Sequence, residues 1–191
     1  MSIAPLPENE ARRLDALAQY HILDSIDEQA YDDITFLASQ ICGVPIALVS
    51  FIDKDRQWLK SRIGIDVKET PRDIAFCAHA ILDPHHVMQV RDATHDARFS
   101  DNPLVTSEPR IRFYAGAPLV TAAGDALGTL CVIDQKPRTL TEGQRRALEA
   151  LSRQIVAQLE LRKALDDLST HIREQQVYEE NSRLTSCVLR N

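Results

Sequence analysis

The 191-residue chain contains no run of about 18 apolar residues, so the sequence predicts no membrane-spanning helix. Its N-terminus also lacks a basic stretch followed by an apolar core, which a secretory signal would need. The composition is 44% hydrophobic and 26% charged, as in globular proteins. We therefore expect a cytoplasmic protein that does not insert into membranes.

The chain also lacks an excess of basic charge. It carries 22 Lys and Arg against 28 Asp and Glu, for a net charge of −6, and no basic stripe interrupts this acidic balance. A nucleic-acid-binding surface needs such a stripe. An anionic membrane surface would attract the same kind of basic patch. We therefore expect no nucleic-acid partner and no membrane partner.

Cysteine pairs at metal-binding or redox spacing are missing as well. The four cysteines are far apart in the sequence and form no CxxC motif, which argues against a zinc ribbon and a thioredoxin-like site. Without an export signal, free thiols are the default state. A nucleophile elbow and the lysine of a phosphate-binding loop are also absent. The cysteines are Cys42, Cys77, Cys131 and Cys187.

Glycine and proline are absent from the last 48 residues of the chain, after Gly143. Average composition would place about six of these residues there. Because glycine and proline mark turns, this tail is predicted to be one uninterrupted helix. A helix of about 45 residues would be about 68 Å long, too long to be buried on so small a domain.

The tail has a heptad pattern, in which two rows of residues recur every seven positions. Apolar residues fill five of the eight positions and glutamine fills three, which predicts a modest coiled coil. One interpretation is a solvated helix, and the other is a parallel homodimer helix that carries a signal to a module beyond Asn191. We favour the dimer, because isolated helices need burial to persist. The apolar seam residues are Leu151, Leu161, Leu165, Leu168 and Ile172.

The remaining 140 residues are rich in turns. Two amphipathic helices are expected first, and Ser25 and Glu28 form a capping box before the second, which Gly43 ends. A capping box at Thr141 and Gln144 opens the tail helix. Strands are predicted over 46–52, 57–63, 87–90, 113–121 and 127–134, and the strand over 57–63 is expected to be a more polar edge strand. A helix is predicted over 73–82 and a polar loop over 92–110. Because hairpins imply antiparallel pairing, the fold class is α+β.

Several of these segments resemble a known family. The segments 73–82, 90–105, 111–119 and 127–134 are similar to blocks of bacterial GAF domains and occur in the same order. The resemblance runs from about Asp24 to Leu161. It implies an antiparallel sheet of about six strands with helices on both faces and a long C-terminal helix. The division into parts would be an N-terminal helical segment (1–23), a GAF-like sensory domain (24–140) and a signalling helix (141–191).

The resemblance further implies a small-molecule pocket on one face of the sheet, covered by the mid-chain helix and loop. GAF domains commonly precede histidine kinase, cyclase or phosphodiesterase modules, so this chain could be a fragment of a longer protein or a stand-alone member. The cofactor is unknown. The residues carried over as pocket-lining are Phe76, Cys77, His79, Phe99, Asn102, Pro103, Phe113, Ala115 and Gly116.

A metal site and a site for bound bilin or haem are two further candidates. Four histidines lie between Cys77 and Asp96, but their spacing matches no metal-ligand pattern, so no metal is expected. Ala78 separates Cys77 from His79, so the Cys-His pair that attaches a bilin is absent, and an axial haem role for His79 is left open. Among the arginines that could clamp an anion, Arg110 and Arg112 rank highest, because they flank the expected pocket strand.

The leading hypothesis is therefore a sensory domain without catalysis of its own, which binds a small molecule and transmits the signal through a dimeric helix. One alternative is a thiol enzyme like the free methionine-(R)-sulfoxide reductases, in which Cys77 and Cys131 would meet across the pocket. The other is a structural dimerisation domain with a filled core. Cyclic nucleotides, haem, nitrate and amino-acid derivatives remain open as ligands.

Overall fold

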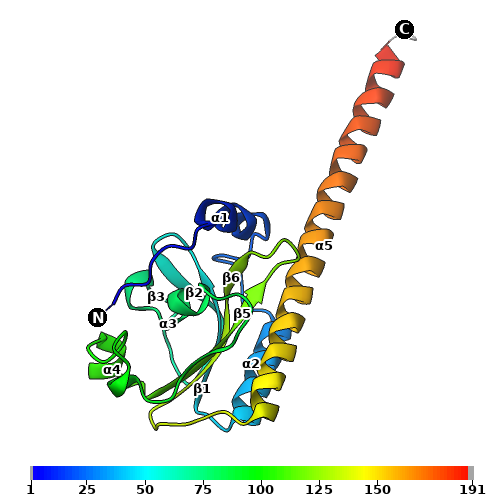
Figure 1. The fold of residues 1–191 in the computed structure, drawn as a ribbon. Helices are drawn as coiled ribbons and strands as arrows, with labels where there is room; N and C mark the ends of the chain where they lie inside the picture. The colour runs from blue at the N-terminus through cyan, green and yellow to red at the C-terminus, as the bar shows by residue number, and fades with distance from the viewer. Residues whose placement is uncertain (1, 189–191) are drawn as a thin grey trace.

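The computed structural model describes residues 2–188, with side-chain surroundings up to Glu179. One antiparallel sheet of six strands forms its centre, in the order β3-β2-β1-β6-β5-β4 (Figure 1). This arrangement confirms the predicted α+β class and the six-stranded antiparallel sheet. The strands are β1 (Ile46–Ile52), β2 (Arg56–Ile63), β3 (Glu69–Pro71), β4 (Met88–Val90), β5 (Phe113–Val120) and β6 (Ala126–Asp134).

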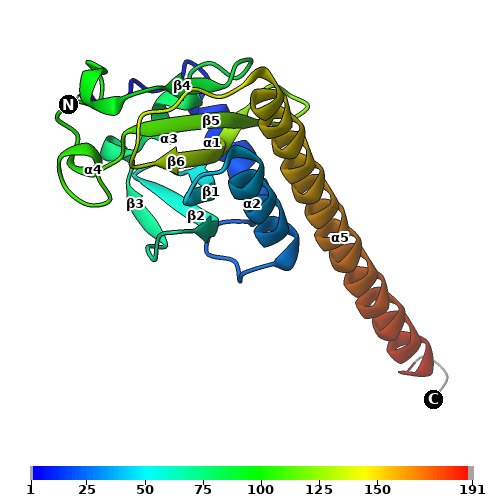
Figure 2. The same ribbon diagram turned by 90° about the horizontal axis from the view of Figure 1, so that it is seen from below.

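Helices cover both faces of the sheet. The helices α2 (Gln29–Cys42) and α5 (Glu142–Val188) lie side by side on one face, and α3 (Phe76–Ala80) and α4 (Pro103–Thr106) lie on the other (Figure 2). Each face has its own hydrophobic cluster, one with α2 and α5 and one with α3. Short 3₁₀ turns, η1 (Arg72–Ile74) and η2 (Ala93–His95), lie in the connections on the α3 side.

The central strands follow from their sequences. All seven residues of β1 are buried, as expected for an almost continuously apolar strand that is covered on both faces. Gly128 of β6 is needed where β1 comes close, because a Cβ there would lie 1.9 Å from the carbonyl oxygen of Ser50. The absence of a side chain therefore allows β1 and β6 to pair at this point.

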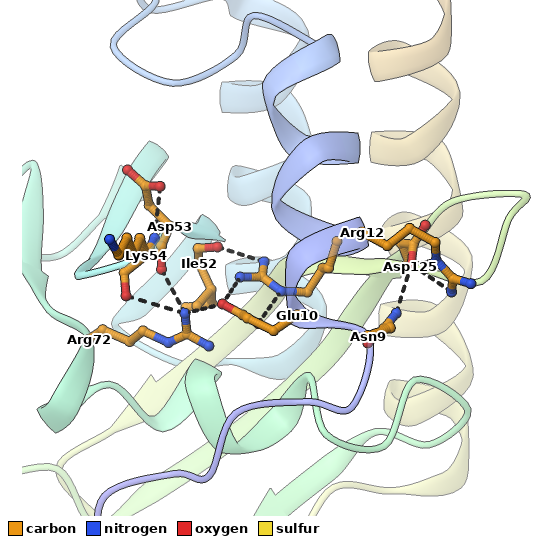
Figure 3. Close-up of polar contacts among 9 residues, drawn as sticks. Asn9, Glu10, Arg12, Ile52, Asp53, Lys54, Arg72 and Asp125 are labelled. Carbon is orange, nitrogen blue, oxygen red and sulfur yellow. Dashed lines mark hydrogen bonds and ion pairs between the residues drawn. The ribbon is translucent and has the colours of Figure 1, made fainter.

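The helix α1 (Glu10–Gln19) is held at one end of the sheet by ionic contacts (Figure 3). Arg13 is fully buried and donates hydrogen bonds to the carbonyl of Ile52, at 2.6 Å, and to the carboxylate of Glu10. Arg72 donates to the same carboxylate. Burial raises the pKa of Glu10, but the hydrogen bonds from Arg13 and Arg72 outweigh it and lower that pKa to about 2. Ionised Glu10 therefore joins α1 to η1, and Arg72 also donates to the carbonyls of Asp53 and Lys54 in the turn after β1.

The long helix α5 begins as predicted. Gln144 N–H donates to the Thr141 hydroxyl at 3.2 Å, and the Gln144 side chain accepts from the Thr141 N–H at 3.0 Å, which confirms this capping box. At 1.5 Å per residue its 47 residues span about 70 Å. Its first half packs on α2 and β5, and its second half projects away from the domain (Figure 1). Among the residues that the structure describes, no helix has the length and apolar character of a membrane span.

Three sequence predictions were wrong in detail. No capping box forms at Ser25 and Glu28: α2 begins at Gln29, and the Ser25 hydroxyl bonds the carbonyl of Ile22 instead. The predicted helix over 73–82 is the 3₁₀ turn η1 followed by the five-residue helix α3. The polar loop contains η2 and α4.

The second strand, β2, is not a wet edge. The short strand β3, which the sequence analysis missed, pairs with it and forms the edge. Lys60 and Ser61 of β2 are buried because residues before and within α2 satisfy their polar groups. Lys60 Nζ donates to the carbonyl of Ile26, and the Ser61 hydroxyl donates to Asp32 at 2.6 Å.

Candidate functional site

A cavity of about 350 Å³ lies between the sheet and its α3 cover. Its volume is within the range of small-molecule pockets. The floor comes from β1, β2, β5 and β6, one wall from the β2–β3 connection, and the cover from α3, α4 and the loop after α4. The lining residues are Ile46, Leu48, Gln57, Leu59, Ile65, Asp66, Val67, Thr70, Phe76, Cys77, Leu104, Glu108, Pro109, Ile111, Tyr114 and Ile133.

The lining is mainly apolar and has no cationic side chain. Gln57, Asp66, Thr70 and Glu108 supply its polar groups besides Cys77 and Tyr114. The Thr70 hydroxyl is buried and has no hydrogen-bond partner within the described part of the chain. A buried hydroxyl without a partner is costly, so a bound group that reached this oxygen would stabilise it. The cavity is therefore suited to a largely apolar molecule with one hydrogen-bonding group.

Two of the predicted site residues, Phe76 and Cys77, line the cavity from α3. A third, Phe99, lies behind them, where its ring stacks on that of Phe76 with centroids 3.9 Å apart. Phe99 is 1% exposed and belongs to the hydrophobic cluster on this face. It supports the cover and does not line the cavity.

Asn102 and Pro103 shape the loop that covers the cavity. The Asn102 side chain accepts a hydrogen bond from the Leu104 N–H at 2.9 Å and so caps α4, and Pro103 occupies the first turn of this helix. The Asn102 amide also donates to the carbonyl of Ile74 at 3.0 Å. Asn102 thus ties α4 to the segment before α3, and α4 places Leu104 in the lining.

The structure places Phe113 and Ala115 on the opposite face of the sheet. Both belong to the cluster with α2 and α5. Successive residues of a strand point to opposite faces, so the residue of β5 that reaches the cavity is Tyr114, which the sequence analysis did not single out. We therefore correct the pocket assignment of Phe113 and Ala115.

Gly116 lies on the same face as Tyr114 and makes room for it. A Cβ at Gly116 would lie 2.2 Å from the Tyr114 hydroxyl oxygen. The tyrosine ring therefore lies along the strand over this glycine, and its hydroxyl reaches the Cys77 sulfur at 3.3 Å. Gly116 acts through Tyr114 and does not itself line the cavity.

The charged candidates lie outside the cavity. His79 Nε2 is 3.0 Å from the carbonyl oxygen of Ser2, and its ring meets Phe99 edge-on. Arg110 is exposed and pairs with Glu108 at 3.3 Å. Arg112 donates to the carbonyls of Val105, Arg110 and Ile111, and so ties the loop together instead of facing the cavity.

The family assignment rests on a match over most of the chain. The sequence model of the GAF domain family matches residues 28–159. The chain belongs to the GAF domain family. GAF domains are sensory domains, so this GAF domain is a module of the signalling type.

Known proteins similar to this GAF domain come from bacterial signalling systems. A cyclic di-GMP phosphodiesterase of Pseudomonas aeruginosa is 46% identical over 160 residues, which are 83% of this chain. The match covers only 27% of that relative's length. The matched region therefore spans about a quarter of the length of this relative.

Two solved structures share the fold at low sequence identity. The GAF domain of an Acinetobacter phosphoenolpyruvate-protein phosphotransferase has a TM-score of 0.58 at 16% identity, over 82% of this chain and 98% of that one. A bacteriophytochrome of R. palustris has a TM-score of 0.61 at 14% identity, over 90% of this chain and 41% of that one. At these identities the likeness concerns the fold alone.

Proposed function

We propose that this GAF domain is a sensor without catalysis of its own that binds one small, largely uncharged molecule in the cavity and passes the signal through a parallel α5 dimer to an output module. The observation that carries the proposal is the apolar cavity with the unpartnered Thr70 hydroxyl. A structural dimerisation domain with a filled core would leave no such space. The proposed ligand supplies the hydrogen bond that Thr70 lacks.

The charges around the cavity narrow the ligand class. Asp66 and Glu108 are part of the lining. Arg110 is exposed and pairs with Glu108, and Arg112 donates to loop carbonyls, so neither arginine lines the cavity. Burying an anion without a cationic partner is strongly unfavourable. Nitrate and nucleotides therefore fit this lining less well than a neutral molecule with one or two polar groups.

Native mass spectrometry of protein purified from cells tests ligand binding. The chain should carry a bound small molecule, and Leu104→Trp should lose it because the larger side chain fills the cavity. Leu82→Trp is the matched control, since Leu82 is 37% exposed and does not line the cavity. A molecule bound equally to both variants would contradict the cavity as its site, and no bound molecule in either variant or in the parent chain would argue for the ligandless structural alternative.

The dimer proposal rests on the exposed seam of α5. Leu161, Leu165, Leu168 and Ile172 are 45–56% exposed, which is a large apolar stripe for a helix that leaves the domain. Their spacing of four, three and four residues is that of a coiled-coil seam. Leu151 is half-buried and packs against the domain core, so the seam available to a partner begins at Leu161.

The seam starts where α5 makes its last contacts with the domain. The Tyr20 hydroxyl donates to Glu160 at 2.7 Å, and Arg162 pairs with Glu28 beside the buried amine of Lys60. Beyond Lys163 nearly all described side chains of the helix are exposed. A change in the domain can therefore reach the seam through these two anchor residues of α5.

Sedimentation tests the dimer directly. Leu165→Asp combined with Leu168→Asp should convert a dimer to a monomer, because both charges would be buried in the seam. Thr170→Asp is the control on the outward face of the same helix. An unchanged association state in both variants, or a monomeric parent chain, would contradict the dimer.

The kind of output module is proposed from the similarity to the Pseudomonas relative. The Pseudomonas relative is named as a cyclic di-GMP phosphodiesterase, and this chain corresponds to about a quarter of it. We assign the parts of this chain as a helical segment (1–23), a sensory domain (24–140) and a signalling helix (141–191) that would act on an enzyme of that kind. Fusing the chain to such an output domain should make the domain's activity depend on the seam residues.

A further inference from the structure

Two cysteines from different layers of the fold meet at the edge of the cavity. Cys77 comes from α3 and Cys131 from β6, and their sulfur atoms are 3.8 Å apart. Both thiols are free, and the side chains are 1% and 0% exposed. A disulfide needs the sulfurs about 2.05 Å apart, so a shift of under about 2 Å would join them. The shift would fall on α3, the five-residue helix that carries Cys77.

Hydroxyl groups surround the Cys77 sulfur. The Tyr114 hydroxyl donates to it at 3.3 Å, and the hydroxyls of Ser50 and Thr129, which are 3.2 Å apart, lie on the adjacent strands. Burial raises the pKa of the Cys77 thiol, but hydrogen bonds with Cys131, Ser50, Thr129 and Tyr114 outweigh it and lower that pKa. Hydrogen bonds that favour the thiolate make a cysteine more reactive.

The other two thiol environments near the sheet differ from that of Cys77. The pKa of Cys131 is raised, first by its hydrogen bond with Cys77 and then by burial, so Cys131 keeps its proton. Cys42 lies on the opposite side of the sheet, and burial raises its pKa to about 11. The geometry thus pairs one activated sulfur with one protonated neighbour, and Cys42 provides an internal reference.

The cavity brings reagents of the size of hydrogen peroxide next to Cys77. Cys77 is part of its lining, and a volume of about 350 Å³ is roughly ten times the volume that a water molecule occupies in the liquid. Because Cys77 and Cys131 are 1% and 0% exposed, an oxidant in the cavity meets their sulfurs only when the cover formed by α3 shifts.

We propose that Cys77 and Cys131 are a redox-active dithiol that hydroperoxides convert to an intramolecular disulfide. The Cys77 thiolate attacks the peroxide, its S–O bond forms as the O–O bond breaks, and the leaving alkoxide or hydroxide takes up a proton. The Cys131 sulfur then attacks the Cys77 sulfenic acid, releasing water and forming the S–S bond. In balance, two thiols and one hydroperoxide give one disulfide, one alcohol or water, and one water.

This modification does not depend on the ligand proposed above. The disulfide would join the cover of the cavity to its floor and so give the domain an oxidative input. Loss of ligand binding in Leu104→Trp and failure of disulfide formation would be separate results. Either proposal can therefore fail alone.

The experiment uses a variant with Cys42→Ser and Cys187→Ser, in which Cys77 and Cys131 are the remaining thiols. One equivalent of hydrogen peroxide per chain should remove both free thiols and make the intact protein lighter by two hydrogen atoms, and dithiothreitol should reverse this. A reference variant with Cys77→Ser, Cys131→Ser and Cys187→Ser, in which Cys42 is the remaining thiol, should lose its thiol about tenfold more slowly. Adding Tyr114→Phe to the first variant should slow the reaction about threefold or more.

The parent chain carries the same test without substitutions. After oxidation and proteolysis, the peptides with Cys77 and Cys131 should be cross-linked to each other. Overoxidised Cys77 without a disulfide, a disulfide through Cys42, or oxidation no faster than in the reference variant would overturn the proposal.

Discussion

The clearest structural role assigned above is that of Gly116, and its replacement by alanine gives a quantitative prediction. The new methyl group would lie 2.2 Å from the hydroxyl oxygen of Tyr114, 2.8 Å from its Cζ and 3.0 Å from its Cε1. Because both residues are buried, the ring has to move. Overpacking of this kind destabilises a core by about 1–3 kcal/mol. Loss of the hydrogen bond to Cys77 adds about 1 kcal/mol, so we expect Gly116→Ala to lower the free energy of unfolding by about 2–4 kcal/mol.

A double-mutant cycle separates this mechanism from general damage to β5. Tyr114→Phe removes the atom closest to the new methyl group and also removes the hydrogen bond to Cys77. In that background Gly116→Ala should destabilise by only about 1–2 kcal/mol, because the ring carbons remain in the way. The measurement is urea unfolding of the four proteins in the cycle.

The matched control is Gly143→Ala in the first turn of α5. A Cβ there would have its nearest neighbour, the Thr141 hydroxyl oxygen, at an ordinary 3.9 Å. Alanine is favoured over glycine in a helix by up to about 1 kcal/mol, so this change should be neutral or stabilising. The reasoning is refuted if Gly116→Ala behaves like the control, or if it has the same effect with Tyr114 and with Phe at position 114.

Two further predictions concern acid stability and catalysis. The pKa of Glu10 in the folded chain, about 2, is below its ordinary value of 4.5, so its contribution is present above pH 4.5 and is lost as the pH falls toward 2. Glu10→Gln should therefore lower the free energy of unfolding at pH 7 by about 1–3 kcal/mol, and this difference from the parent should vanish near pH 2. Chemical denaturation at a series of pH values measures the difference. A difference that does not change with pH would contradict the role of the Arg13–Glu10–Arg72 network. With methionine-(R)-sulfoxide and dithiothreitol we expect no more product from the parent chain than from Cys77→Ser, whereas turnover that is lost on this substitution would favour the thiol reductase.

The parts of the fold that could be predicted from the sequence are those specified by local patterns. The apolar run of β1, the hairpin of β5 and β6, and the capping box at Thr141 each depend on neighbouring residues. The strand β3 could not be found in this way, because three residues with one proline carry no periodic signal. The buried position of Lys60 was equally hidden, since its partners come from the segment before α2.

The site was predicted only in part for a related reason. Phe76 and Cys77 do line the cavity. Alternation along β5, however, gives two faces without saying which one the cavity uses. A usable signal was present, because the row with Phe113 and Ala115 continues as the apolar residues Ala117 and Leu119, as expected for a face packed on helices. The floor residues of β1 and β2 were missed because both faces of these strands are buried.

The correction on β5 also shows how the cavity and the long helix can be coupled. Tyr114 faces the cavity, while its neighbours Phe113 and Ala115 pack in the same cluster as Ile155 and Leu159 of α5. A ligand or disulfide that displaces Tyr114 therefore acts on a strand whose other face supports the helix, across a single sheet. Close-packed layers transmit such shifts because they contain few voids to absorb them. Position alone does not establish coupling, so the decisive observation is whether oxidation of Cys77 and Cys131 changes the association of the α5 seam, and whether Tyr114→Phe weakens that change.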